Sequence, residues 1–115
     1  MPYFSVQTSK PMKASVAADL AIKMSAFAAE LIGKPEAYVM TALNPDTTMT
    51  FAGSHAPAAF IEVKSIGLSE AKCDAFADKI SAFIRAELGI EPDRTFIDFT
   101  DLPRTRFAWN GKTFA

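Results

Sequence analysis

The sequences ELIGKPEAYVMTAL (residues 30–43) and AELGIEPDRTFIDF (residues 86–99) follow one plan. In each, an apolar helical pattern ends at a glycine, and a proline follows within three residues. Glycine suits the left-handed residue that ends a helix, and proline prevents the helix from resuming. A run rich in β-branched and aromatic residues then begins. The two stretches therefore predict a helix–turn–strand unit that occurs twice in the chain.

The residues ahead of each stretch extend this unit. Alternation predicts a strand before each helix, with Phe4 and Val6 on one face of the first strand. Ser15 and Ser69 are expected to cap the two helices. The apolar face of the first helix should consist of Val16, Leu20, Met24, Phe27 and Leu31. In chain order the predicted elements are a strand at Pro2–Thr8, a helix at Val16–Ile32, strands at Tyr38–Leu43, Met49–Ala52 and Ala59–Ile66, a helix at Glu70–Leu88, and strands at Thr95–Thr100 and Arg106–Trp109.

Two strand–helix–strand units predict an α/β fold in the form of an α+β two-layer sandwich. A helical crossover makes the two strands that it joins parallel. We expect a four-stranded mixed sheet with two helices on one face, in a single domain over residues 1–115 with an internal repeat at about 1–58 and 59–115. The other face of the sheet would be bare in a monomer, which favours self-association.

The composition of the 115 residues argues against several classes of protein. Twelve basic and 13 acidic residues are well mixed and give a net charge of −1, so no basic face for nucleic acid is expected. No apolar run reaches the ~18 residues of a membrane span, and the N-terminus does not resemble a signal peptide. A single cysteine excludes an internal disulfide. We expect a cytoplasmic protein, with secretion without a leader left open.

Few side chains beyond the N-terminus are candidates for catalysis or metal binding. His55 is the only histidine and Cys73 the only cysteine, so no zinc site and no metal or other cofactor are expected. Cys73 lies on the apolar stripe of the second helix and is expected to be an inert core thiol. Lys34 follows a helix C-terminus, where the helix dipole favours a cation. The aromatic residues near the C-terminus fit either a tail packed on the core or the wall of a ligand site: Phe107, Trp109 and Phe114.

Pro2 is the most distinctive group for catalysis. Proline has no N–H for a sheet, so it suits the first residue of a strand. Removal of the initiator methionine, which a small second residue favours, would leave Pro2 with a free secondary amine. Such an amine serves as a base near neutral pH when apolar walls or a neighbouring cation lower its pKa. From the residues alone, an ordinary strand-starting proline remains the alternative.

The chain resembles the macrophage migration inhibitory factor family of the tautomerase superfamily in five stretches that span its length. These are MPYF at 1–4, GKPEAYV at 33–39, SIG at 65–67, PDRTFIDF at 92–99 and WNGKTFA at 109–115. The resemblance implies a homotrimer with active sites between subunits. It also implies a keto–enol tautomerase of phenylpyruvate-like 2-oxo acids, an enzyme of the isomerase class that uses no cofactor.

The resemblance implies roles for single residues as well. Pro2 would be the general base, and Lys34 would hold the carboxylate or enolate oxygen of the substrate. The backbone N–H of Ile66 would donate to the same end, and Phe96 and Asp98 would come from the neighbouring subunit. The other residues of the pocket would be Tyr3, Tyr38, Lys64, Ser65, Phe107, Trp109 and Phe114.

Four positions differ from the animal members of the family. Phe96 replaces a tyrosine and Asp98 replaces an asparagine. Phe107 replaces a valine, and Lys64 stands where histidine is frequent. We therefore expect activity on phenylpyruvate-like acids and weaker activity on bulky or esterified substrates. The family's CxxC oxidoreductase motif is missing, because residues 58–61 read AAFI.

Two other functions stay open. The altered pocket also fits a cytokine-like protein that binds a receptor and has weak or vestigial tautomerase activity. Hydrolytic dehalogenation or decarboxylation, as in sister families, typically adds an arginine pair to the pocket. The sequence alone does not place any arginine there; the four are Arg85, Arg94, Arg104 and Arg106.

Overall fold

The structure is a computed structural model that describes residues 2–115. Met1, on whose removal the predicted chemistry depends, lies outside the described residues. The main elements are β1 (Tyr3–Thr8), α1 (Ala14–Ile32), β2 (Met40–Asn44), β3 (Ala59–Ser65), α2 (Glu70–Leu88) and β4 (Thr95–Asp101). Single 3₁₀ turns occur at Glu36–Tyr38, Pro92–Arg94 and Arg104–Arg106, and a C-terminal hairpin consists of β5 (Ala108–Trp109) and β6 (Lys112–Thr113).

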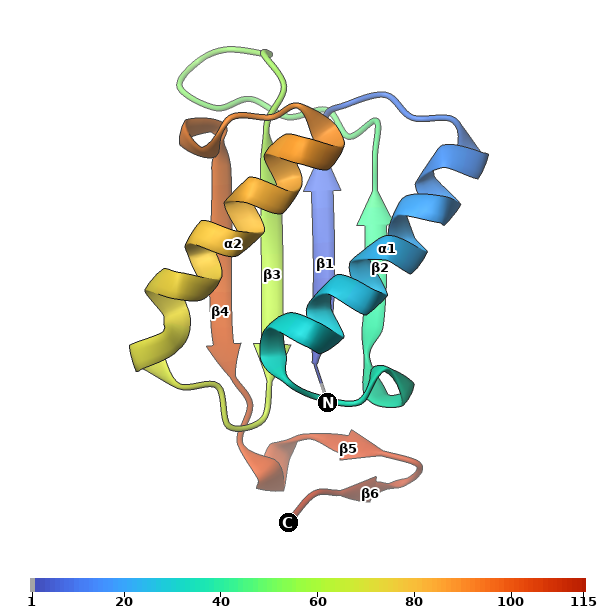
Figure 1. Ribbon diagram of the computed structural model, residues 1–115, viewed down its shortest axis with the longest axis vertical. Helices are drawn as coiled ribbons and strands as arrows, with labels where there is room; N and C mark the ends of the chain where they lie inside the picture. The colour runs from blue at the N-terminus through green and yellow to red at the C-terminus, as the bar shows by residue number, and fades with distance from the viewer. Residues whose placement is uncertain (1) are drawn as a thin grey trace.

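The four long strands form one mixed sheet in the order β2-β1-β3-β4. The strands within each half are parallel, β1 with β2 and β3 with β4, as the helical crossovers require. The two halves meet where β1 pairs antiparallel with β3. Figure 1 shows both helices on the same face of this sheet and the small hairpin at the end of the sheet that also holds both chain termini. The predicted two-layer α+β fold is confirmed.

The core lies between the helices and the covered face of the sheet. Phe4 and Val6 of β1 and Ile61 and Val63 of β3 are fully buried there. Phe27 of α1 stacks on Phe83 of α2 with ring centroids 4.2 Å apart, which joins the two helices directly. Gly33 and Gly89 end the helices in the left-handed conformation, with φ of 77° and 69°. Within residues 2–115 no helix has the length and apolar character to cross a membrane.

No helix or strand among residues 2–115 covers the opposite face of the sheet (Figure 1). Its side chains include Met40, Phe60 and Phe96, which are 65%, 40% and 53% exposed. Large apolar side chains gathered on one side are typical of a surface that another molecule covers.

Several predicted details of the helices and their caps are wrong. α1 begins at Ala14, so Ser15 lies inside its first turn rather than at the cap. Ser69 does occupy the cap of α2, but its side chain makes no capping hydrogen bond. Val16 is exposed rather than part of the apolar face, and the first buried residue of α1 is Leu20. Cys73 is only partly buried, and its Sγ lies 3.5 Å from the Ser69 carbonyl oxygen.

Three predicted strands are shorter or missing. The 3₁₀ turn at Glu36–Tyr38 delays β2 to Met40, and the turn at Arg104–Arg106 leaves only Ala108–Trp109 extended. Met49–Ala52 forms no strand: Phe51 makes a single bridge to Ser54, because Ala52 and Gly53 turn the chain with φ of 54° and 71°.

Arg94 holds the long segment between β2 and β3 against the sheet. Its guanidinium donates hydrogen bonds to the carbonyl oxygens of Pro57, Ala56 and Phe51 at 2.9, 3.0 and 3.3 Å. The same group lies 5.2 Å from the centroid of the Phe51 ring. A segment without strands of its own therefore has a defined path.

We expect Arg94→Met to lower the free energy of unfolding by about 1–2 kcal/mol, because a charged donor is lost from these carbonyls. The measurement is the urea midpoint at fixed protein concentration. Arg85→Met is the matched control: Arg85 makes only an exposed ion pair with Glu91 at 3.4 Å, so its loss should cost below about 0.5 kcal/mol. Equal shifts in the two variants would contradict this account.

Candidate active site

A cavity of about 390 Å³ opens beside Pro2, at the start of β1. Pro2 is fully buried, and its carbonyl oxygen accepts a hydrogen bond from the Met40 N–H at 3.0 Å. β1, β3, the start of β2 and the turn before it supply one part of the wall, and the C-terminal segment supplies the rest. The lining residues are Pro2, Tyr3, Tyr38, Met40, Lys64, Leu102, Phe107, Ala108 and Trp109.

Aromatic contacts hold the C-terminal hairpin over the cavity. The Trp109 ring meets Tyr38 edge to face, with centroids 5.8 Å apart. Phe114 stacks on Phe107 at 5.7 Å, and its N–H donates to the Phe107 carbonyl oxygen at 3.0 Å. Arg104 fixes the end of the hairpin, because its Nε donates to the Phe114 carbonyl oxygen at 3.1 Å. The apolar wall is thus built by residues far apart in the sequence.

The cavity contains one charged side chain, that of Lys64. Lys64 faces Tyr3 in the antiparallel pairing of β1 and β3. A single cation among aromatic and aliphatic walls suits a ligand with an apolar body and one anionic group.

Lys34 and Ile66 line a second, smaller cavity of about 210 Å³, between the end of α1 and the start of α2. The structure therefore brings these two predicted residues together but does not place them in the lining of the Pro2 cavity. Ser65 lies in the chain between Lys64, which lines the Pro2 cavity, and Ile66, which lines the smaller one. It is fully buried, and its Oγ lies 3.4 Å from the Ile66 carbonyl oxygen.

Phe96 and Asp98 lie on the open face of the sheet and do not line the Pro2 cavity. The Phe96 ring meets Phe51 edge to face at 5.0 Å. Asp98 pairs in register with Glu62 of β3, and its Oδ1 lies 3.4 Å from the Thr100 hydroxyl. Both residues are exposed, so they are available to another molecule that covers this face.

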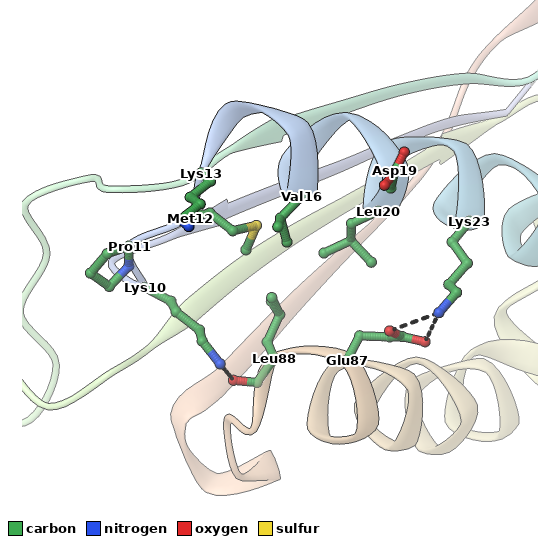
Figure 2. A pocket seen from close by; sticks show the side chains of 10 residues that line it. All are labelled: Lys10, Pro11, Met12, Lys13, Val16, Asp19, Leu20, Lys23, Glu87 and Leu88. Atoms are coloured by element: carbon green, nitrogen blue, oxygen red, sulfur yellow. Dashed lines mark hydrogen bonds and ion pairs between the residues drawn. The ribbon is translucent and has the colours of Figure 1, made fainter.

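A larger hollow of about 540 Å³ lies between the start of α1 and the end of α2, away from Pro2. Figure 2 shows that two of its lysines are engaged within the chain. The Lys10 Nζ donates to the Leu88 carbonyl oxygen at 2.6 Å, and Lys23 pairs with Glu87 at 3.2 Å. These contacts tie the start of α1 and the segment before it to the end of α2.

The remaining candidates lie elsewhere. His55 contacts only the Met49 carbonyl oxygen, at 3.2 Å, among the hydrogen bonds of residues 2–115. Across the same described residues, no group of three or more His, Cys, Asp and Glu side chains is arranged to hold a metal ion. None of the four arginines lines the Pro2 cavity.

Sequence reasoning missed three lining residues, Met40, Leu102 and Ala108. The signal for Met40 was present, since it follows Tyr38 by two positions and pairs with Tyr3 across the parallel ladder. No pattern pointed to Leu102 or Ala108, because both enter the wall only through the path of the C-terminal segment.

Comparison with known proteins covers the whole chain. The family profile described as "Macrophage migration inhibitory factor (MIF)" matches residues 1–115. A macrophage migration inhibitory factor homolog of Brugia malayi is 36% identical, over 99% of both chains. Macrophage migration inhibitory factor of Mus musculus is 34% identical over the full length of both. The crystal structure of a homologue from Prochlorococcus marinus, 40% identical, superposes with a TM-score of 0.90 over 98% of this chain and 99% of that one. The chain belongs to the macrophage migration inhibitory factor family of the tautomerase superfamily.

Proposed function

We propose that this protein is a keto–enol tautomerase of phenylpyruvate-like 2-oxo acids that uses Pro2 as its general base after Met1 is removed. The observation that carries the proposal is the cavity beside Pro2, which combines aromatic walls with one cation. An arylpyruvate has the matching parts, an aromatic ring and one carboxylate.

The reaction moves one proton. The neutral prolyl nitrogen removes a proton from the carbon next to the keto group, and the electron pair of that C–H bond passes to the oxygen as an enolate. The protonated amine then returns the proton to the oxygen and gives the enol; the reverse sequence gives the ketone. No redox partner is required, and the base is regenerated in each turnover.

Two features of the site would favour this chemistry. The apolar surroundings of Pro2 would favour the neutral form of its amine once Met1 is removed, and the neutral form is the one that acts as a base. Lys34 and the Ile66 N–H, in the roles that the family resemblance implies, would stabilise the enolate oxygen. Removing one preorganised donor of this kind typically costs about 2.7–4 kcal/mol.

The proposal includes a homotrimer. The open sheet face with its exposed Met40, Phe60 and Phe96 needs a cover, and a second copy of the chain supplies one. In such an assembly Phe96 and Asp98 would reach the site of a neighbouring subunit, which accounts for their absence from the cavity of their own chain.

Pro2→Gly should lower the rate of phenylpyruvate tautomerisation by about 100-fold or more, since a positioned general base contributes that much. The assay follows enol and ketone by absorbance, and mass spectrometry of the same sample confirms the loss of Met1. A wild-type fraction that retains Met1 serves as the control and should be inactive, because an amide nitrogen is no base. A correctly processed Pro2→Gly protein with the wild-type rate would overturn the assignment.

Phe60→Asp should dissociate the assembly, because it places a charge on the face that a second copy covers. Sedimentation velocity of the wild type should give three times the chain mass of 12.5 kDa. The variant should sediment as a monomer and lose activity with it. Ala75→Asp, on the exposed surface of α2, is the matched control and should stay trimeric. A monomeric, active wild type would refute the trimer.

Receptor binding is the second candidate function, because relatives such as the Mus musculus protein are named macrophage migration inhibitory factors. The outer surface of α1 supports it, since Ile22 is 70% exposed. Saturable binding to macrophages that survives Pro2→Gly and is lost in Ile22→Glu is the expected result. Binding that Ile22→Glu leaves unchanged would remove this surface from consideration.

A further inference from the structure

We propose that Asp101, the last residue of β4, is a positioning residue of the active site: its carboxylate holds the turn at residues 66–68 so that the Ile66 N–H points at the substrate. Asp101 lines neither the Pro2 cavity nor the smaller one, so it would act only through this turn. The inference deepens the proposed function and rests on it for the role of the Ile66 N–H as a donor to the enolate oxygen.

One oxygen of the Asp101 carboxylate accepts two hydrogen bonds from the turn that follows β3. Its Oδ1 accepts from the Gly67 N–H at 2.9 Å and from the Leu68 N–H at 3.0 Å. Gly67 is left-handed, with φ of 75°, and successive N–H groups in such a turn form a concavity that binds an anion. Hydrogen bonds to an ionised acceptor are also stronger than those between neutral groups. Asp101 therefore fixes the peptide units on both sides of Gly67.

The peptide unit that contains the Ile66 N–H is held from β4 as well. Ser65 and Asp101 are register partners at the ends of β3 and β4, and the next residue, Leu102, donates its N–H to the Ser65 carbonyl oxygen at 2.9 Å. The Ser65 carbonyl and the Ile66 N–H belong to one planar unit and point in opposite directions. Because the carbonyl faces β4, the N–H is turned toward the side of β3 on which β1 lies, and Pro2 directly precedes β1.

The Ile66 N–H has no acceptor of its own among residues 2–115. None of the backbone or side-chain hydrogen bonds of these residues uses it as a donor. Ile66, Gly67 and Leu68 line the smaller cavity together with Lys34. Of three successive N–H groups, Asp101 thus engages the second and third and leaves the first to a ligand.

Amide NMR tests the position of this N–H without turnover. The probe is 3-phenylpropionate, an unreactive aromatic acid, titrated into isotope-labelled protein from which Met1 has been removed. The Ile66 amide proton should move downfield in the wild type, and Asp101→Ala should abolish most of that shift. Asp101→Asn should retain it, because the amide oxygen accepts the same two hydrogen bonds. Asp93→Ala is the matched control, since Asp93 is exposed and precedes β4 at its other end.

Turnover of phenylpyruvate separates positioning from a general structural role. Asp101→Ala should lower kcat by about 10- to 100-fold, and far more than it raises KM, because a misplaced donor loses contact with charge that develops in the transition state. Asp101→Asn should restore most of kcat. Asp101→Glu keeps the charge but displaces the oxygen by one methylene, so it should resemble Asp101→Ala. If Asp101→Ala does not fold, the comparison of Asp101→Asn with Asp101→Glu decides.

Three results would overturn the inference. The first is a wild-type response of the Ile66 amide to the acid in both Asp101→Ala and Asp101→Glu. The second is an Asp101→Asn protein as impaired as Asp101→Glu, and the third is a wild-type Ile66 amide that does not respond to the acid. Failure of the proposed function looks different: the Ile66 amide then responds in the wild type and not in Asp101→Ala, but the wild type does not tautomerise phenylpyruvate.

Discussion

The antiparallel pairing of β1 with β3 is the contact on which both the fold and the site depend. It is the one junction in the sheet between the two strand–helix–strand halves. On the covered face it sets Phe4 against Val63 and Val6 against Ile61, all fully buried. On the open face the same register sets Tyr3 against Lys64. A slip of one residue would exchange the two faces and lose the core and the site together.

Pro2, the residue directly before β1, bears both on strand pairing and on the proposed chemistry. A proline cannot donate to a sheet, so the ladder on this side ends at Pro2, whose carbonyl still accepts from Met40. In the proposed function, the nitrogen that cannot donate to a strand is the one that transfers the proton once Met1 is removed. Pro2 is buried, and apolar surroundings would favour the neutral form of the amine that we propose as the base.

The sequence was sufficient where structure is local or periodic. Gly33 and Gly89 end the helices as predicted, since both require the left-handed conformation. Ser15 failed as a cap because the helix begins at Ala14, two residues before the predicted start at Val16. Met49–Ala52 failed as a strand because a turn at Ala52 and Gly53 interrupts it. The grouping of Lys64 rather than Lys34 with Pro2 depends on strand register and on the path of the C-terminal segment, which no spacing reveals.

The strands and the C-terminal hairpin, which together form the cavity wall, are held in place by different interactions. Pro2, Tyr3 and Lys64 belong to or adjoin central strands that are hydrogen-bonded along their length. The segment that leads to the hairpin is joined to the end of β3 by one backbone hydrogen bond, from the Leu102 N–H to the Ser65 carbonyl oxygen. The hairpin itself contacts the rest of the wall through side chains, such as Trp109 with Tyr38. The proposed proton transfer requires fixed geometry, which hydrogen-bonded strands would supply. Entry of a substrate ring would require a wall that can move, and the side-chain contacts of the hairpin are weaker than the hydrogen-bonded pairing of the strands. If the proposed function holds, changes at Phe107 should alter which substrate ring binds, while β1 and β3 still fix the position of Pro2.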